Sequence, residues 1–215
     1  MEASKFVVQT FMGIDLDISP GALVPRQETE LLGWTAVKLL GGLEAPRVID
    51  MCCGSGNLAC AMARAVPGAR VWASDLTDGC VTLARRNVEK LELSDRIRVH
   101  QGDLFAPLAE LEAGSIDLVV CNPPYISSAK LAERHDLADE PREAFDGGPY
   151  GLTIHQRVLK EALPFLRPGG WLAFEFGLGQ ERQLSTLFKR VRAYEAIELI
   201  QNEAGEPRVA IGRKS

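Results

Sequence analysis

The feature that most restricts the fold of this chain is a regular alternation of short apolar runs with segments of helical periodicity. Strands that alternate with helices are typical of α/β proteins, in which helices cover both faces of a mostly parallel sheet. We therefore predict an α/β fold, with Asp78 as the N-cap of one helix. The predicted strands are residues 47–51, 69–74, 97–100, 116–121 and 171–176, and the predicted helices are residues 28–40, 57–66, 78–93, 153–165 and 180–191.

Both ends of the chain have a different pattern, that of a β-hairpin. Near the N-terminus, Gly13 separates residues 6–12 from residues 14–18, and the second run alternates apolar and acidic side chains. Near the C-terminus, residues 196–201 and 208–211 flank a polar turn, and their hairpin would place one antiparallel strand at an edge of the sheet. We predict an N-terminal β-hairpin extension, 1–26, and one main domain, 27–215.

The composition is that of an ordinary globular protein, with 46% hydrophobic and 25% charged residues. The net charge of −5 disfavours tight, unspecific binding of nucleic acid, which needs neutralisation of phosphates. The five cysteines form no Cys-x-x-Cys pair and no zinc spacing with histidine, so we predict a reduced, cytoplasmic protein without a metal site. The longest uncharged stretch, residues 51–63, is too short to cross a bilayer, so no membrane association is expected.

Glycines and an acid follow the first two predicted strands at positions that suit a nucleotide-type ligand. The first strand is followed by Cys-Cys-Gly-Ser-Gly at residues 52–56, and its two glycines allow backbone to approach a ligand closely. Asp75 ends the second strand, where one carboxylate can accept hydrogen bonds from both hydroxyls of a ribose. These positions share the carboxyl edge of the sheet, where ligands bind. The dinucleotide pattern Gly-x-Gly-x-x-Gly is not met, and Gly-Ser-Gly alone also suits a tight turn.

The tetrapeptide Asn122-Pro123-Pro124-Tyr125 follows the predicted strand 116–121. The prolines fix the backbone and remove two donors, which leaves the Pro123 carbonyl available to a ligand, and the Asn122 side chain offers a second acceptor. Two neighbouring acceptors can bind both N–H groups of a planar NH2, on which Tyr125 can stack. Such binding directs the nitrogen lone pair toward an electrophile, so we predict that all four residues are catalytic. A rigid turn is the alternative interpretation.

Asp50 opens an Asp-x-x-x-Gly-x-Gly order that is followed by Asp75 and, after the third strand, by Asp103. This order resembles the methyl-donor site of class I S-adenosylmethionine-dependent methyltransferases, which have a Rossmann-like fold. Residues 23–32, 140–152 and 168–180 further resemble release factor glutamine N5-methyltransferases, and with Asn-Pro-Pro-Tyr the resemblance covers nearly the whole chain. One departure is Cys52, which stands where the first glycine of the usual triplet would fall.

The resemblance implies a seven-stranded, mostly parallel sheet with an antiparallel C-terminal strand, preceded by the short hairpin. It implies that residues 27–215 are a methyltransferase catalytic domain with S-adenosyl-L-methionine as cofactor. Arg26, Glu28 and Thr29 would close over the site, although a helix cap and a surface ion pair would explain Arg26 and Glu28 equally well. The residues implied in cofactor binding are Asp50, Cys52, Cys53, Gly54, Gly56, Asp75, Leu76, Asp103, Leu104 and Asn122.

The substrate is less constrained than the chemistry, which is methyl transfer to a planar nitrogen. Members of the resembled family carry a separate helical N-terminal domain that helps to recognise the protein substrate, whereas the hairpin predicted here begins a few residues from Met1. A glutamine amide of a protein or peptide, a small amine or amide metabolite and a nucleobase all stay open. An activator subunit or a second copy would replace the missing domain, and a non-catalytic, partner-binding scaffold is a further alternative.

Overall fold

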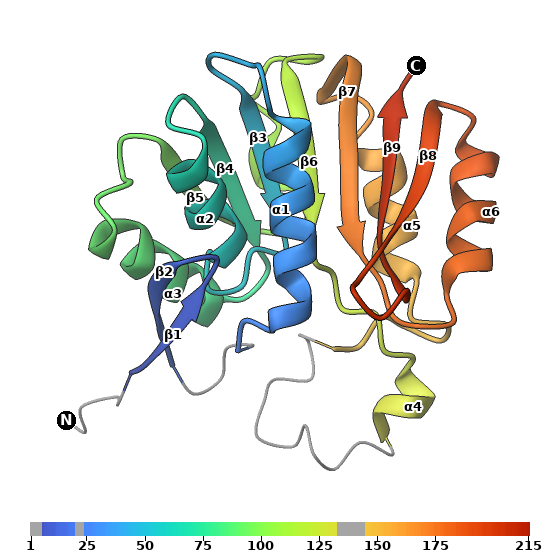
Figure 1. The fold of residues 1–215 in the computed structure, drawn as a ribbon, viewed down its shortest axis with the longest axis horizontal. Coiled ribbons are helices and arrows are strands. Elements are labelled where there is room, and N and C mark those ends of the chain that lie inside the picture. The colour runs from blue at the N-terminus through green and yellow to red at the C-terminus, as the bar shows by residue number, and fades with distance from the viewer. Residues whose placement is uncertain (1–5, 20–23, 133–144) are drawn as a thin grey trace.

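The computed structural model describes residues 6–19, 24–132 and 145–215. A seven-stranded sheet runs through its centre in the order β5-β4-β3-β6-β7-β9-β8 (Figure 1). The strands from β5 to β7 are parallel, and β9 is antiparallel to both β7 and β8, as the predicted fold class requires. The strands are β3 (Arg47–Met51), β4 (Arg70–Asp75), β5 (Ile97–Gln101), β6 (Ile116–Cys121), β7 (Leu166–Glu175), β8 (Tyr194–Gln201) and β9 (Pro207–Lys214).

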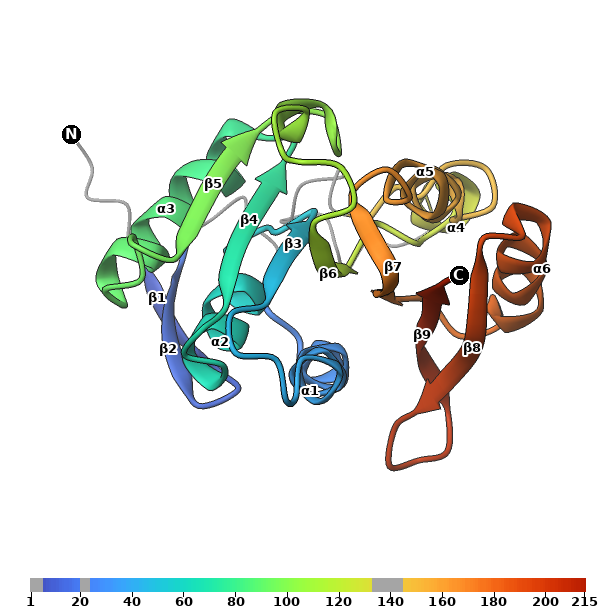
Figure 2. The ribbon, with the colours of Figure 1, turned by 90° about the horizontal axis from the view of Figure 1, so that it is seen from above.

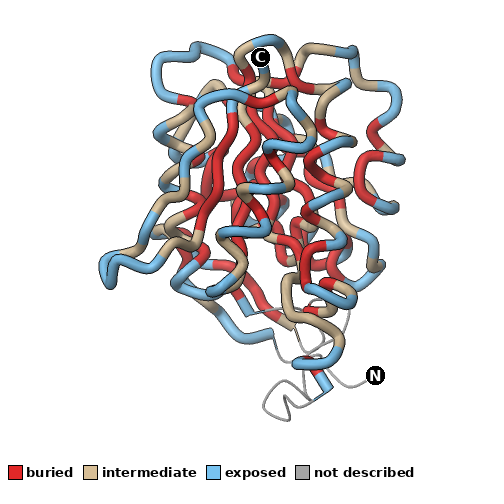
Figure 3. Tube along the Cα trace, turned by 90° about the vertical axis from the view of Figure 1, so that its right-hand side faces the viewer, coloured by how far each residue is buried: buried red, intermediate tan, exposed pale blue. Residues whose placement is uncertain are grey.

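Helices cover both faces of the sheet (Figure 2). Because successive side chains of a strand point to opposite faces, Val48 and Ile49 of β3 enter two different apolar clusters. One cluster contains buried residues of α1 (Glu30–Leu39), α2 (Asn57–Ala65) and α3 (Asp78–Lys90), and the other those of α5 (Thr153–Glu161) and α6 (Glu181–Val191). Figure 3 shows the buried strands between more exposed outer layers. The short helices are η1 (Gln27–Thr29), η2 (Ala106–Leu108) and α4 (Ser128–Ala132).

No helix in the described ranges combines the length and the apolar character that crossing a lipid bilayer requires.

The C-terminal hairpin differs from the prediction in which of its strands is at the edge. The antiparallel strand β9 lies between β7 and β8, so β8 is the edge strand. Val209, Ala210 and Ile211 of β9 are buried, whereas Glu195 and Glu198 of β8 are exposed. The apolar strand therefore takes the position with two neighbours, and the charged strand takes the edge, where charges discourage pairing with another chain.

Three predicted boundaries are corrected by the structure. The helix predicted to run to residue 165 ends at Glu161, because Pro164 cannot continue a helix. The helix predicted over residues 78–93 ends at Lys90, and its N-cap is Thr77 rather than Asp78, since the Thr77 hydroxyl accepts from the Cys80 N–H at 3.4 Å. The strand predicted from residue 171 begins at Leu166, with a shift in register against β6.

The predicted N-terminal hairpin is confirmed as β1 (Val7–Phe11) and β2 (Ile14–Ile18), which pair antiparallel. Its buried Asp17 joins it to α3: the carboxylate accepts from Arg86 Nε at 2.6 Å and from Lys90 Nζ at 2.5 Å. The Asn87 Nδ2 donates to the Asp17 carbonyl at 2.9 Å. The hairpin thus packs on the sheet's helical layer, while the predicted boundary between 1–26 and 27–215 remains a prediction and lies beside residues outside the described ranges.

Candidate active site

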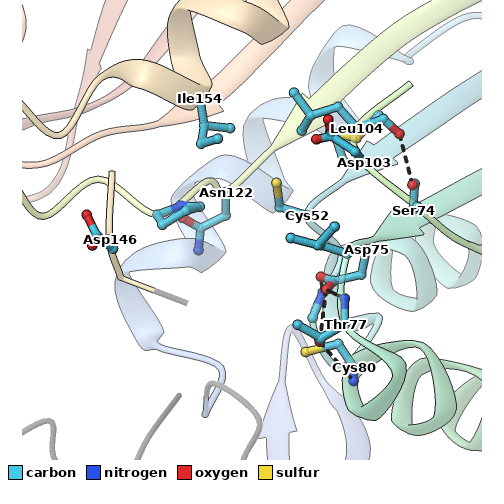
Figure 4. A pocket seen from close by; sticks show the side chains of 15 residues that line it. Cys52, Ser74, Asp75, Thr77, Cys80, Asp103, Leu104, Asn122, Asp146 and Ile154 are labelled. Carbon is cyan, nitrogen blue, oxygen red and sulfur yellow. Dashed lines mark hydrogen bonds between the residues drawn. The ribbon is translucent and has the colours of Figure 1, made fainter. Parts of the chain in front are cut away.

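A cavity of about 360 Å³ opens where β3, β4 and β6 end (Figure 4). This is the carboxyl edge of the parallel strands, where open α/β sheets bind ligands, and its volume is that of a small-molecule site. In Figure 4 the Cys52 sulfur lies between Asn122 on one side and Asp75 on the other. The residues predicted from sequence that line this cavity are Cys52, Gly54, Asp75, Leu76, Asp103, Leu104, Asn122 and Pro124.

The turn that follows β3 has a left-handed backbone at three residues, with φ of +58° at Cys52, +54° at Gly54 and +77° at Gly56. A Cβ at Gly54 would meet nothing within 4 Å, so the space beside this glycine is open to a ligand. A Cβ at Gly56 would lie 3.2 Å from the Ala84 Cβ, so Gly56 lets the turn approach α3. Cys52 keeps the conformation that a glycine would adopt more easily, because a Cβ disfavours it.

Three residues predicted to bind the cofactor, Asp50, Cys53 and Gly56, are not on the wall of this cavity. Asp50 is fully buried, and its carboxylate accepts from the Ala59 N–H at 2.9 Å in the first turn of α2. Burial raises the pKa of Asp50 to about 8. Cys53 lines a smaller adjacent cavity together with Thr29 and Asn122. In this structure Asp50 therefore stabilises the start of α2 from the protein interior and does not line the cavity.

Asp75 is fixed at the cavity wall by three donors. Its Oδ2 accepts from the Gly54 N–H at 2.9 Å, and its Oδ1 accepts from the Thr77 N–H at 3.1 Å and from the Thr77 hydroxyl at 3.2 Å. A carboxylate has about four acceptor positions, so acceptor capacity remains for a ligand. The turn after β3 and the carboxylate after β4 are thereby joined into one rigid unit.

Asp103 reaches the same cavity from the segment after β5 and forms a two-pronged ion pair with α5. Arg157 Nη1 lies 2.9 Å from Asp103 Oδ1, and Arg157 Nη2 lies 3.0 Å from Oδ2. The Asp103 side chain is 58% exposed, so this pair contributes little to stability and mainly fixes the direction of the carboxylate.

The predicted catalytic tetrapeptide directly follows β6. The side chains of Asn122 and Tyr125 form hydrogen bonds with different partners. Asn122 Nδ2 donates to the Thr29 hydroxyl at 3.1 Å. The Tyr125 hydroxyl donates to Glu175 Oε1 at 3.1 Å, and Gln180 Nε2 donates to the Tyr125 carbonyl at 3.0 Å. Burial and the neighbouring Glu175 raise the pKa of Tyr125, which keeps its hydroxyl protonated. Pro123 is buried, and Pro124 reaches the cavity wall.

The structure places two charged residues behind Tyr125 to which the sequence assigned no role. Glu175, at the end of β7, is only 1% exposed, and Arg208 of β9 lies with Nη2 3.8 Å from Glu175 Oε1. Burial raises the pKa of Glu175, and hydrogen bonding from Thr29, the charge of Arg208 and hydrogen bonding from Tyr125 act in the opposite direction. A single acid in the apolar run Leu-Ala-Phe-Glu-Phe, residues 172–176, was the available signal for a buried functional carboxylate.

The three residues predicted to close over the site face two neighbouring cavities. Arg26 and the buried Thr29 line the smaller cavity together with Asn122. Arg26 and Glu28, which are both exposed, also line a wider groove with Tyr125 and Arg208. The groove has a volume of about 890 Å³ and lies on the Tyr125 side of the tetrapeptide. Residues 140–144 of the segment that resembles the family lie outside the described ranges.

Within residues 6–19, 24–132 and 145–215, no three His, Cys, Asp or Glu side chains gather as a metal ion would require.

Known proteins resemble this chain both in sequence and in fold, and the sequence relatives are described first. The family model of the methyltransferase small domain matches residues 34–140. A release factor glutamine methyltransferase of Moorella thermoacetica is 39% identical over 93% of this chain and 70% of its own length. The enzyme of the same name from Gloeobacter violaceus is 36% identical over 92% of this chain and 69% of its own length.

The solved structures that resemble the chain have lower sequence identity to it, so they support the fold alone. The catalytic domain of hMettl16 in complex with the MAT2A 3′UTR hairpin 6 has a TM-score of 0.72 at 20% identity, covering 94% of this chain and 76% of that one. The ribosomal protein L11 methylase of Lactobacillus delbrueckii subsp. bulgaricus has a TM-score of 0.64 at 21% identity, covering 92% and 84%.

The strand order, the antiparallel β9 and the cavity at the ends of β3, β4 and β6 define a class I S-adenosylmethionine-dependent methyltransferase. Within this class, the chain belongs to the release factor glutamine methyltransferase family.

Proposed function

We propose that this enzyme methylates the side-chain amide nitrogen of a glutamine in a protein substrate, and that a bacterial release factor is that substrate. The observation that carries the proposal is the position of Asn122 and Pro124 on the wall of the cavity that Asp75 and Gly54 also line. A planar nitrogen held by the tetrapeptide would therefore meet the methyl donor directly. The curated relatives act on release factors by name, which supports the choice of substrate.

The residues around the cavity fit S-adenosylmethionine. The 360 Å³ volume suits a small molecule, the open space beside Gly54 admits a close approach, and the fixed Asp75 carboxylate offers acceptors for ribose hydroxyls. In this proposal Asp103, Leu76 and Leu104 border the adenine, and Cys52 faces the methionine part. The bound donor supplies an electrophilic methyl group on a sulfonium sulfur.

The work of the chain is to hold the acceptor nitrogen and to keep water away from it. Asn122 Oδ1 and the Pro123 carbonyl each accept one N–H of the amide, which draws the lone pair out of conjugation and directs it along the line of transfer. Tyr125 covers the flat group. With the donor bound, the held nitrogen would accept its methyl group as the bond from that methyl to the donor sulfur breaks, and it would release one proton to solvent.

The test of this proposal uses donor with a labelled methyl group, the purified enzyme and a purified bacterial release factor. We expect label in the release factor, recovered as methylglutamine after digestion. Asn122→Ala should lower turnover about 10²–10³-fold, as the loss of one preorganised polar contact does. Near-normal turnover in this variant, with donor affinity unchanged, would contradict the role of the tetrapeptide. Label in the small-molecule fraction or in nucleic acid would show that the methyl acceptor is a metabolite or a nucleobase and not a protein.

We further propose that the enzyme works in the cytoplasm and that residues 27–215 form the catalytic unit, with 1–26 as an extension. All five cysteines are free thiols, which supports a reducing compartment. The chain spans about 70% of the length of the relatives it matches. We also propose that a second copy or an activator subunit contributes to substrate recognition. Activity that rises when a cell extract is added to purified enzyme and release factor would support a partner, and full activity of the isolated monomer would exclude one.

A further inference from the structure

The side chain of Gln180 joins three segments of the chain behind the predicted catalytic tetrapeptide. Gln180 is the N-cap residue of α6, and its side-chain Oε1 accepts from the Gly177 N–H at 2.9 Å. Its Nε2 donates to the Tyr125 carbonyl at 3.0 Å. The same Nε2 lies 3.3 Å from the Gly151 carbonyl oxygen and 3.4 Å from the Tyr150 carbonyl oxygen. One amide therefore links the segments that follow β6 and β7 with the turn that precedes α5.

These partners require a side chain that donates and accepts hydrogen bonds at the same time. The Gly177 N–H can only donate and the three carbonyls can only accept, so only one orientation of the Gln180 amide satisfies them. Among the described residues, no backbone N–H donates to the Tyr125 carbonyl, which is thus held by the side chain of Gln180. An ionised carboxylate in place of the amide would keep the acceptor and lose both donors, and an apolar side chain would lose all of them.

The backbones that Gln180 connects are packed closely around Tyr125. A Cβ at Gly151 would overlap the Tyr125 carbonyl oxygen, and a Cβ at Gly177 would lie 3.1 Å from Tyr125 Cδ2. The Tyr125 ring therefore packs on the Gly177 backbone, whose N–H Gln180 also binds. The Tyr125 hydroxyl is fixed separately, by donation to Glu175 at 3.1 Å. Of the three points that hold this tyrosine, the carbonyl and the ring thus depend on Gln180.

We propose that Gln180 is a positioning residue, which holds Tyr125 and the backbone of the tetrapeptide in the place from which they bind the methyl acceptor. This inference rests on the proposed function, because Tyr125 covers the flat amide group there. Without the Gln180 amide, the tyrosine would be tethered by its hydroxyl and free to shift at its carbonyl. Gln180 lies outside the described wall of the donor cavity, so its loss should reduce turnover and leave binding of the methyl donor intact.

The first measurement uses Gln180→Met, which removes the donors and the acceptor at nearly constant length. With a purified release factor as substrate, we expect kcat to fall about tenfold or more, with the dissociation constant of S-adenosylmethionine within about twofold of wild type. The matched control is Gln156→Met on the exposed side of α5, which should leave kcat unchanged. Wild-type kcat in Gln180→Met would overturn the inference. A wild-type enzyme that leaves the release factor unlabelled would instead overturn the proposed function.

The variant Gln180→Glu separates hydrogen bonding from packing. When protonated, the introduced carboxyl can accept from the Gly177 N–H and donate to the Tyr125 carbonyl, and when ionised it can only accept. We therefore expect the ratio of its kcat to the wild-type kcat to rise about threefold or more between pH 8 and pH 5.5, because the lower pH restores the donor. A ratio that does not change with pH would overturn the inference. Should Gln180→Met not fold, this pH dependence decides alone.

A third measurement follows the position of Tyr125 without any methyl acceptor. The chain has three tyrosines, so fluorine NMR of protein labelled with ring-fluorinated tyrosine should give one signal for each, and Tyr125→Phe assigns the signal of Tyr125. We expect Gln180→Met to shift or broaden this signal and to leave that of Tyr194, whose hydroxyl donates to the Leu159 carbonyl at 2.9 Å, unchanged. An unchanged Tyr125 signal would contradict the positioning role, whatever the substrate of the enzyme.

Discussion

At the scale of single residues, the two glycines after β3 have the same backbone requirement but different surroundings. Both Gly54 and Gly56 have positive φ, which costs an alanine about 1–2 kcal/mol. The added methyl of Gly54→Ala would enter open space beside the cavity, whereas that of Gly56→Ala would lie 3.2 Å from Ala84 Cβ. We expect Gly54→Ala to weaken binding of S-adenosylmethionine at least tenfold by calorimetry, while Gly56→Ala changes the affinity less and the stability more.

Chemical denaturation provides the control for this pair. Gly54→Ala should lower the free energy of unfolding by about 1 kcal/mol and Gly56→Ala by about 2 kcal/mol, because only the second adds a steric contact to the backbone cost. Equal effects of the two substitutions on donor affinity would show that Gly54 has no special access to the ligand.

Residue by residue, the sequence predicted those parts of the site that are local along the chain. Asn122 and the left-handed turn at Gly54 follow strands and Asp75 ends one, and strand ends can be read from apolar runs. The grouping of Glu175 with Arg208 was not predictable in the same way. It depends on the antiparallel register of β7 and β9, in which Glu175 pairs with Val209, next to Arg208. Register across distant strands is set by packing of the whole sheet.

At the scale of elements, the N-terminal hairpin is attached to α3 through one buried acid. Two cations, Arg86 and Lys90, lower the pKa of Asp17 below its ordinary value, and the Lys90 hydrogen bond is the larger cause. Because the folded pKa is lower than the unfolded one, this stabilisation is present above about pH 4 and is lost as the pH falls through the folded pKa. We expect Asp17→Asn to lower the free energy of unfolding by about 2 kcal/mol at pH 7, and by less at pH 3.

Asp15 of the same strand gives a matched control. Its side chain is exposed and accepts only from the Thr10 hydroxyl at 2.7 Å, so Asp15→Asn should change stability by no more than about 0.5 kcal/mol at either pH. Urea titrations of both variants at the two pH values measure the difference. A pH-independent cost of Asp17→Asn would show that the ion pairs do not attach the hairpin.

Elements were predicted better in type than in extent. Hydrophobic periodicity located the five parallel strands and the helices α2, α3 and α5 between them, because burial on one or both faces dictates that pattern, whereas the short η2 and α4 were not predicted. The exchanged places of β8 and β9 could not be read from periodicity, since both strands are compatible with either position in the hairpin. The difference is decided by three-dimensional burial of residues 209–211 against β7.

At the scale of the whole molecule, donor binding should stabilise the fold, because the cavity is built from several segments of the sheet at once. Its wall combines residues after β3, β4, β5 and β6, which separate on unfolding. At 100 times its dissociation constant, a ligand of the native state adds about 2.7 kcal/mol. For a chain of this size we expect S-adenosylmethionine or its demethylated product to raise Tm by about 5–10 °C in a thermal-shift assay.

Asp75→Ala is the control for this stabilisation, since its carboxylate is the proposed ribose acceptor. The variant should fold yet show a Tm that responds far less to the donor at the same concentration. An equal Tm increase in wild type and Asp75→Ala would place the donor elsewhere on the molecule.

The reactivity of Cys52, in the left-handed turn after β3, should report whether the neighbouring cavity is occupied. Four of the five thiols are buried, and burial raises the pKa of Cys60 to about 12 and of Cys80 to about 11, so they react slowly with alkylating reagents. Cys52 alone is partly exposed, on the wall of the donor cavity. The rate at which iodoacetamide modifies one thiol per chain should therefore fall as donor is added. The dependence of this modification rate on donor concentration would measure donor affinity before any methyl acceptor has been identified.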